Sequence, residues 1–103
     1  MTEGERFRRD IAFAVAKAKS GQNAEELYRS PGLKMYRYGE NTGSWRKRGD
    51  AVEVVHLRGH WTKDAVEAFT ALLVQDMKEM GCSRVAWVGR PAWRRFLRMK
   101  GFL

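Results

Sequence analysis

The sequence has few of the residues that mark secreted, membrane or proline-rich proteins. Its 103 residues include one cysteine and two prolines, and no apolar run reaches the roughly 18 residues of a membrane span. Cys82 cannot form a disulfide within the chain, which favours a reducing, cytoplasmic setting. Glu3, Glu5 and Asp10 interrupt the amino-terminal segment, so we expect no signal peptide there. We therefore expect one cytoplasmic globular domain that covers residues 1–103.

Acidic residues are missing from one end of the chain. None follows Glu79, and the cations after that position are Arg84, Arg90, Arg94, Arg95, Arg98 and Lys100. Across the chain, 20 lysines and arginines outnumber 12 acids, which gives a formal charge of +8. Such a charge favours anionic partners, namely nucleic acid, phosphate-bearing ligands or acidic protein surfaces, although it also confers solubility on its own.

The first part of the chain predicts two helices. Thr2 has the position of an N-cap, and an apolar stripe of helical period runs through residues 7–18. This helix should end near Ser20, where a glycine follows. Asn23 should cap a second, short helix over residues 24–28.

The middle of the chain predicts an antiparallel meander of three strands. Residues 33–38, 44–48 and 51–58 have the alternation or the valine content of strands. The glycines in the segments 39–43 and 49–50 predict turns between them.

The last part predicts a helix, a strand and a short helix. Apolar residues recur at spacings of three and four over residues 62–80, so this helix should cover the sheet. Residues 84–88 are apolar on both faces, as in a central parallel strand. Pro91 suits the first turn of the final helix, and Gly101 suits its end. Core or structural roles are expected for Trp61, Trp87, Trp93, Met77, Met80, Met99 and Cys82.

This order of elements, with the closing run Lys100-Gly101-Phe102, resembles the second half of the GNAT (GCN5-related N-acetyltransferase) fold. The resemblance covers residues 33–102. It implies an α+β domain with two amino-terminal helices, a three-stranded antiparallel meander, a central helix, a parallel strand and a short final helix. Small GNAT-like proteins of this kind also resemble open reading frames of tailed bacteriophages.

In that family, a glycine-rich loop before the central helix cradles the pyrophosphate of acetyl-CoA on backbone amides. The residues that such an enzyme would use here for the cofactor are Gly59, His60, Thr62 and Asp64, with His60 as general base. The corresponding stretch has one glycine only, and Asp64 would repel a phosphate at the helix terminus. Leu97 occupies the position where the family has a tyrosine that protonates the leaving thiolate. These departures make acyl transfer the weaker hypothesis.

Other patterns could carry contacts. Arg90, Arg94 and Arg98 recur every four residues with Arg95 beside them, which could grip phosphates or carboxylates; the alternative is a solvated helix face. Trp45 lies among cations of the meander, which could form a platform for single-stranded nucleic acid, unless its ring packs on the sheet.

Two histidines, His56 and His60, are four residues apart. They would be far apart along a strand, and no cysteine or acid pattern surrounds them, so we expect no metal site.

The leading hypothesis is a non-catalytic GNAT-like binding or structural protein, of phage-type assembly or virion-associated kind, without a cofactor. It would contact an anionic partner through Arg90, Arg94, Arg95 and Arg98. One alternative is an acetyl-CoA-dependent N-acetyltransferase, and another is a direct nucleic-acid-binding protein that uses the meander. An unpaired sheet edge would also invite pairing between chains, so we expect a homo-oligomer.

Overall fold

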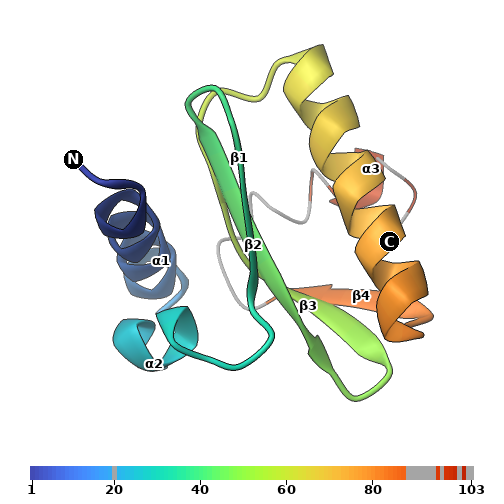
Figure 1. Ribbon diagram of the computed structural model, residues 1–103, viewed down its shortest axis with the longest axis horizontal. Coiled ribbons are helices and arrows are strands. Elements are labelled where there is room, and N and C mark those ends of the chain that lie inside the picture. Colours follow the sequence, from blue (N-terminus) through green and yellow to red (C-terminus); the bar gives the residue numbers. More distant parts are fainter. Residues whose placement is uncertain (20, 88–94, 96, 100, 102–103) are drawn as a thin grey trace.

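The chain folds as a small α+β domain in which helices cover both faces of a mixed four-stranded sheet (Figure 1). The computed structural model describes residues 1–19, 21–87, 95, 97–99 and 101. The elements are α1 (Glu3–Ala18), α2 (Ala24–Tyr28), β1 (Lys34–Tyr38), β2 (Asn41–Arg48), β3 (Ala51–Arg58), α3 (Lys63–Met80) and β4 (Arg84–Trp87). The strands lie in the order β1-β2-β3-β4; the first three are antiparallel, and β4 is parallel to β3. Helices α1 and α2 lie on one face, and α3 lies on the other.

The two amino-terminal helices begin at the predicted caps. The hydroxyl of Thr2 accepts a hydrogen bond from the Glu5 amide, and the Asn23 side chain accepts one from the Glu26 amide. Helix α1 ends with Lys19 in the left-handed conformation at φ 52°. Capping side chains satisfy amides that have no partner within a helix, and this explains why both starts are readable from sequence.

Both hairpins have a glycine at the first position of a two-residue turn. Tyr38 pairs with Asn41 across Gly39 and Glu40, and Gly39 has a φ of 60°. Gly49 has a φ of 64° in the second turn. This is the pattern of a type II′ hairpin, which fits the twist of the flanking strands. The prediction of a turn over residues 39–43 is therefore wrong, since β2 already begins at Asn41.

A β-bulge in β3 decides which side chains face which helix. Ser44 pairs with His56, but the next residue, Trp45, pairs with Val54, so Val55 has no partner on β2. Val55 and His56 consequently both face α1, whereas Val54 and Leu57 on either side of them belong to the α3 side. An extra residue in one strand shifts the alternation in this way.

Helix α3 connects β3 to β4 and ends at a glycine. Thr62 caps it, and Gly81 closes it at φ 67° with its amide donating to the Lys78 carbonyl. The Ser83 amide then donates to the Asp50 carbonyl at 3.0 Å, which fixes the start of β4 beside the turn that precedes β3.

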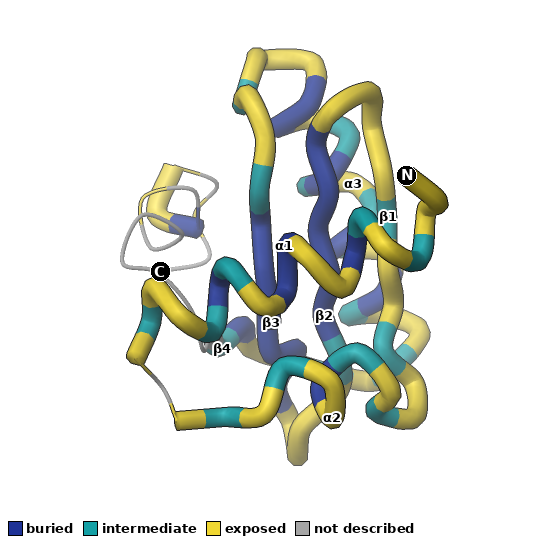
Figure 2. Tube along the Cα trace, turned by 90° about the vertical axis from the view of Figure 1, so that its left-hand side faces the viewer, coloured by how far each residue is buried: buried dark blue, intermediate teal, exposed yellow. Residues whose placement is uncertain are grey.

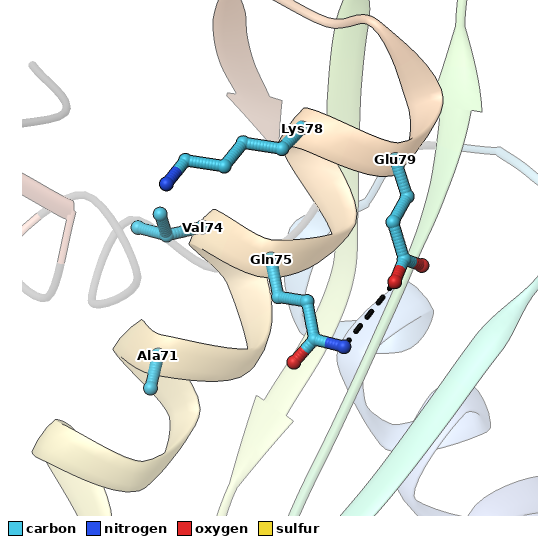
Figure 3. Close-up of a pocket in the computed structure, with 5 residues that line it drawn as sticks. All are labelled: Ala71, Val74, Gln75, Lys78 and Glu79. Carbon is cyan, nitrogen blue, oxygen red and sulfur yellow. Dashed lines mark hydrogen bonds between the residues drawn. The ribbon is translucent and has the colours of Figure 1, made fainter.

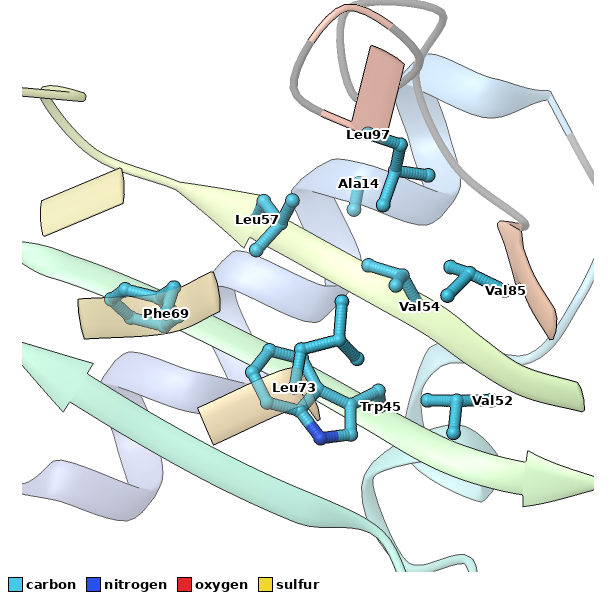
Figure 4. Close-up of a cluster of buried hydrophobic side chains, with 9 residues drawn as sticks. All are labelled: Ala14, Trp45, Val52, Val54, Leu57, Phe69, Leu73, Val85 and Leu97. Carbon is cyan, nitrogen blue, oxygen red and sulfur yellow. The ribbon is translucent and has the colours of Figure 1, made fainter. Parts of the chain in front are cut away.

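The larger buried cluster lies mainly between α3 and the sheet (Figure 4). Its members are Ala14, Trp45, Val52, Val54, Leu57, Phe69, Leu73, Val85 and Leu97, and a second cluster joins Ile11, Leu27 and Val55. Trp61, Met77, Met80 and Cys82 pack against the larger cluster, as predicted. Figure 2 shows β2 and β3 buried along most of their length and β1 largely exposed.

Beyond β4, Arg95 and residues 97–99 are helical, and Gly101 has a φ of 77°. Leu97 is fully buried, but Met99 is 62% exposed. The prediction that Met99 fills the core is therefore wrong. The predictions that concern Pro91, Trp93, Phe102 and the side chain of Trp87 lie outside the described part of the chain.

Candidate functional site

A chain of buried polar side chains connects β3 and β2 to α1. The hydroxyl of Ser44 lies 2.6 Å from His56 Nδ1, and the hydroxyl of Thr42 lies 2.9 Å from His56 Nε2. The Thr42 hydroxyl also donates to Asp10 Oδ2 at 2.6 Å. Serine, histidine, threonine and aspartate thus form one hydrogen-bonded series of four groups beneath α1.

The carboxylate at the end of this series sets the direction of its protons. Asp10 Oδ2 can only accept, so the proton of Thr42 points to it and the oxygen of Thr42 accepts from His56. His56 is then the Nε2–H tautomer, and its Nδ1 accepts from Ser44. This assignment follows from the network of heavy atoms. It leaves the imidazole neutral with both ring nitrogens paired.

Two arginines complete the surroundings of Asp10. Arg58 and Arg9 both donate to Asp10 Oδ1, at 3.0 and 3.2 Å. The guanidinium of Arg58 also lies 4.1 Å from the ring centre of Phe13. Burial lowers the pKa of His56 to about 4, with the Asp10 carboxylate opposing and the Arg58 charge assisting this shift.

The series contains the groups of a nucleophile-activating triad, yet it is sealed. Ser44, His56 and Thr42 are each 0% exposed, and Asp10 is 2% exposed. A nucleophile acts only where a substrate can reach it. The arrangement therefore ties α1 to β2 and β3, and it offers no reactive hydroxyl in this structure.

A second buried carboxylate anchors α3 on the opposite face. Asp76 Oδ2 accepts hydrogen bonds from the hydroxyl of Tyr36 at 2.6 Å and from Trp45 Nε1 at 2.7 Å. The rings of Tyr36 and Trp45 are 5.0 Å apart. Burial, together with the hydrogen bond to Asp76, raises the pKa of Tyr36.

The burial of Trp45 bears on one of the alternative functions. Only 1% of this side chain is exposed, beneath α3. A stacking platform for bases needs an accessible ring face. The alternative in which Trp45 offers its ring to nucleic acid is therefore wrong, and the expectation that this ring packs on the sheet is confirmed.

The loop before α3 is held by contacts within the chain. A Cβ on Gly59, which has a φ of 137°, would collide with Asn41 Oδ1, so packing against Asn41 already requires glycine here. The Thr62 amide donates to the His60 carbonyl, and the Thr62 hydroxyl accepts from the Ala65 amide. His60, Thr62 and Asp64 are exposed. The structure thus explains the lone glycine without a phosphate ligand.

Two surface depressions lie away from the predicted cofactor and partner-binding residues. A groove of about 570 Å³ runs along the outer side of α3, lined by Ala71, Val74, Gln75, Lys78 and Glu79 (Figure 3). Gln75 donates to Glu79, one turn further along the same helix, at 3.2 Å. A smaller pocket of about 340 Å³ is lined by Gly21, Gln22, Asn23, Glu26, Leu27 and Arg46. Neither pocket includes His60, the predicted base of an enzyme.

The arginines divide into two groups by their ion pairs. All nine arginines from Arg6 to Arg84 have a carboxylate oxygen within 4.0 Å. Arg95 and Arg98 are exposed, and neither forms an ion pair with another described residue. Arg90 and Arg94, the other members of the predicted stripe, lie outside the residues described.

The described residues hold no group of three or more histidine, cysteine or acidic side chains placed to bind a metal. Among these residues, no helix has both the length and the apolar character to cross a membrane. Cys82 is a free thiol of intermediate burial.

No protein-family model, curated protein or solved structure matches this chain.

Proposed function

We propose that this domain is a non-catalytic binding protein that contacts an acidic protein surface through Arg90, Arg94, Arg95 and Arg98. The observation that carries the proposal is the contrast between the arginines. Those up to Arg84 are matched by carboxylates of the chain itself, whereas Arg95 and Arg98 are exposed and lie in a segment without any acid. Guanidinium groups without an internal partner are free to pair bidentately with carboxylates of another molecule.

The geometry before α3 supports binding over acyl transfer. Gly59 is accounted for by its contact with Asn41, and the cap of α3 uses the Ala65 amide. Asp64 adds negative charge to the same terminus. In this proposal the domain is GNAT-like in its order of elements and serves as an assembly component of phage type. The N-acetyltransferase with His60 as base is kept as the alternative that calorimetry must exclude.

The experiment measures binding of labelled poly-L-glutamate by fluorescence anisotropy. The double variant Arg95→Glu/Arg98→Glu should bind at least about tenfold more weakly than the wild type, because it removes two cations and adds repulsion. The matched control is Lys47→Glu/Lys63→Glu, which changes the net charge equally at two exposed lysines without ion pairs among the described residues. An equal loss in both variants would show that total charge decides, and would contradict the proposal.

Two further ligands separate the alternatives. Single-stranded DNA that binds more tightly than polyglutamate, with an affinity that falls steeply with salt, would favour the nucleic-acid-binding function. Saturable heat release with acetyl-CoA would favour the enzyme. We expect neither.

A further inference from the structure

Strand β1 forms an exposed edge of the sheet. It pairs with β2 alone among the described strands, and all of its residues except Tyr36 are exposed. Met35 is 38% and Tyr38 is 45% exposed, and both rank among the large apolar side chains that the described residues leave in solvent. A strand edge of this kind is a template for another strand.

The hairpin turn determines which backbone groups of β1 face outward. Tyr38 and Asn41 close a two-residue turn, and the closing pair of such a turn exchanges both of its hydrogen bonds. Pairs that exchange hydrogen bonds alternate along an antiparallel ladder. Tyr38, Tyr36 and Lys34 therefore direct their amides and carbonyls toward β2. Met35 and Arg37 direct theirs away from the sheet.

We infer that the β1 edge is a homodimer interface, in which β1 of a second copy pairs antiparallel about a two-fold axis at Tyr36. Met35 and Arg37 each supply the outward amide and carbonyl that this register requires. In it, Met35 lies opposite Arg37 of the second copy, and Lys34 lies opposite Tyr38 of the second copy. The two sheets would join into one of eight strands. This inference does not depend on the proposed function.

Charge and side-chain type favour this register over the two registers whose axis is shifted by one residue. A two-fold axis at Arg37 would oppose Arg37 to its own copy, which is destabilising. An axis at Met35 would leave Tyr38 without a partner. With the axis at Tyr36, all five residues of β1 pair and no like charges are opposed. Lysine and arginine often protect an edge from pairing, but here each cation meets an aromatic ring or a thioether, which it can cover.

The way in which β1 side chains alternate between the two faces of the sheet is consistent with the same two-fold axis. Tyr36 bonds to Asp76 of α3, and Arg37 pairs with Glu3 of α1 at 3.9 Å, so alternate residues of β1 face opposite layers. A two-fold axis perpendicular to the sheet keeps like layers together. Met35 and Arg37 of both copies then share one face, and Lys34 and Tyr38 of both copies share the other.

The test measures dimer formation by sedimentation velocity over a range of concentrations, for the wild type and for variants that change the charges at positions 34 and 38. The wild type should show a concentration-dependent dimer. Tyr38→Lys places a lysine opposite Lys34 of the second copy, in a pair whose side chains are close, and should weaken the dimer at least about tenfold. Adding Lys34→Glu should restore association, because each lysine at position 38 then faces a glutamate. The matched control, Ala16→Lys, adds the same charge at an exposed position of α1 and should leave the dimer unchanged.

Circular dichroism checks that each variant is folded, and hydrogen exchange provides a second readout. The amides of Met35 and Arg37 should become protected as the concentration rises through the dimer range. A wild type that stays monomeric at all concentrations overturns the inference. So does a dimer that Tyr38→Lys leaves intact, a double variant no tighter than the single one, or a dimer in which these two amides exchange freely.

Discussion

The hydroxyl of Thr42 donates to Asp10 Oδ2 at 2.6 Å, and this bond joins strand β2 to helix α1 in the dry interior of the domain. The same hydroxyl oxygen accepts from His56 at 2.9 Å. One side chain therefore satisfies two buried polar groups that have no access to water. A buried group that loses its partner costs more than the bond itself contributes.

Replacing Thr42 by valine keeps the shape of the side chain and removes both contacts. We expect Thr42→Val to lower the free energy of unfolding by about 2–4 kcal/mol, and Ser44→Ala, which frees only His56 Nδ1, by about 1–3 kcal/mol. Urea denaturation measures both. Thr70→Val is the matched control, because the Thr70 hydroxyl bonds to the Val66 carbonyl of its own helix. Equal losses in all three variants would contradict the special role of Thr42.

The buried imidazole should make the domain sensitive to acid. The pKa of His56 is lowered to about 4 in the fold from 6.5, so between these values the unfolded chain binds a proton that the folded one does not. The contribution of the neutral His56 to the free energy of unfolding is fully present above pH 6.5 and declines as the pH falls toward 4. Between pH 7 and 5, the free energy of unfolding should drop by about 2 kcal/mol.

The control for this prediction is the variant His56→Gln. Denaturant unfolding gives the free energy of unfolding of the wild type and of the variant at pH 7 and at pH 5. The glutamine has no proton to take up, so the drop between pH 7 and 5 should disappear even though the variant is less stable throughout. An unchanged drop would mean that groups other than His56 carry the acid sensitivity.

The opposite face predicts an alkaline effect. The pKa of Tyr36 is raised by burial and by Asp76, so above the ordinary tyrosine pKa near 10 the unfolded state loses a proton first and stability falls. Tyr36→Phe should remove this decline and cost about 1–3 kcal/mol at neutral pH, since Asp76 then keeps only the Trp45 donor on that oxygen. Absorbance at 295 nm, which reports ionised tyrosine, should be equal for the folded wild type and the folded Tyr36→Phe variant. After unfolding above about pH 10, the wild type should show one additional phenolate.

A close approach between β2 and α3 depends on the absence of a side chain at Gly43. A Cβ there would lie 2.7 Å from Phe69 Cε1 and 3.0 Å from Leu57 Cδ2. Gly43→Ala should therefore cost about 1–3 kcal/mol by overpacking. Phe69→Leu should recover part of this loss in the double variant, because it removes the ring that the new methyl group meets. Additive costs in a double-mutant cycle would show that the two sites do not compete for space.

The positions of the helices and strands could be predicted because their signals are local. Thr2, Asn23 and Thr62 all cap the helices that they were expected to cap. Gly39 marks a turn correctly, but the length of that turn depends on the pairing of Tyr38 with Asn41. Pairing is a property of two strands, and a single stretch of sequence does not contain it.

The buried networks could not be predicted for the same reason. Strict alternation from Val52 and Val54 would place His56 under α3, and only the bulge at Val55 turns it toward Asp10. The sequence left open whether the Trp45 ring lies on the surface or packs on the sheet, and the acceptor that holds it inside, Asp76 of α3, lies far away along the chain. Both outcomes depend on partners that lie more than 30 positions away along the chain.

Ser44, His56 and Asp10 are the side-chain types of a hydrolase triad, but here the hydroxyl of Thr42 lies between the imidazole and the carboxylate. The imidazole has a hydroxyl at one nitrogen and, through Thr42, a carboxylate at the other. What this series lacks for chemistry is access for a substrate, because α1 covers it and its members are at most 2% exposed. Phe7, which is 5% exposed and whose ring stands edge-on to His56 at 6.1 Å, is one of the α1 side chains that cover the imidazole.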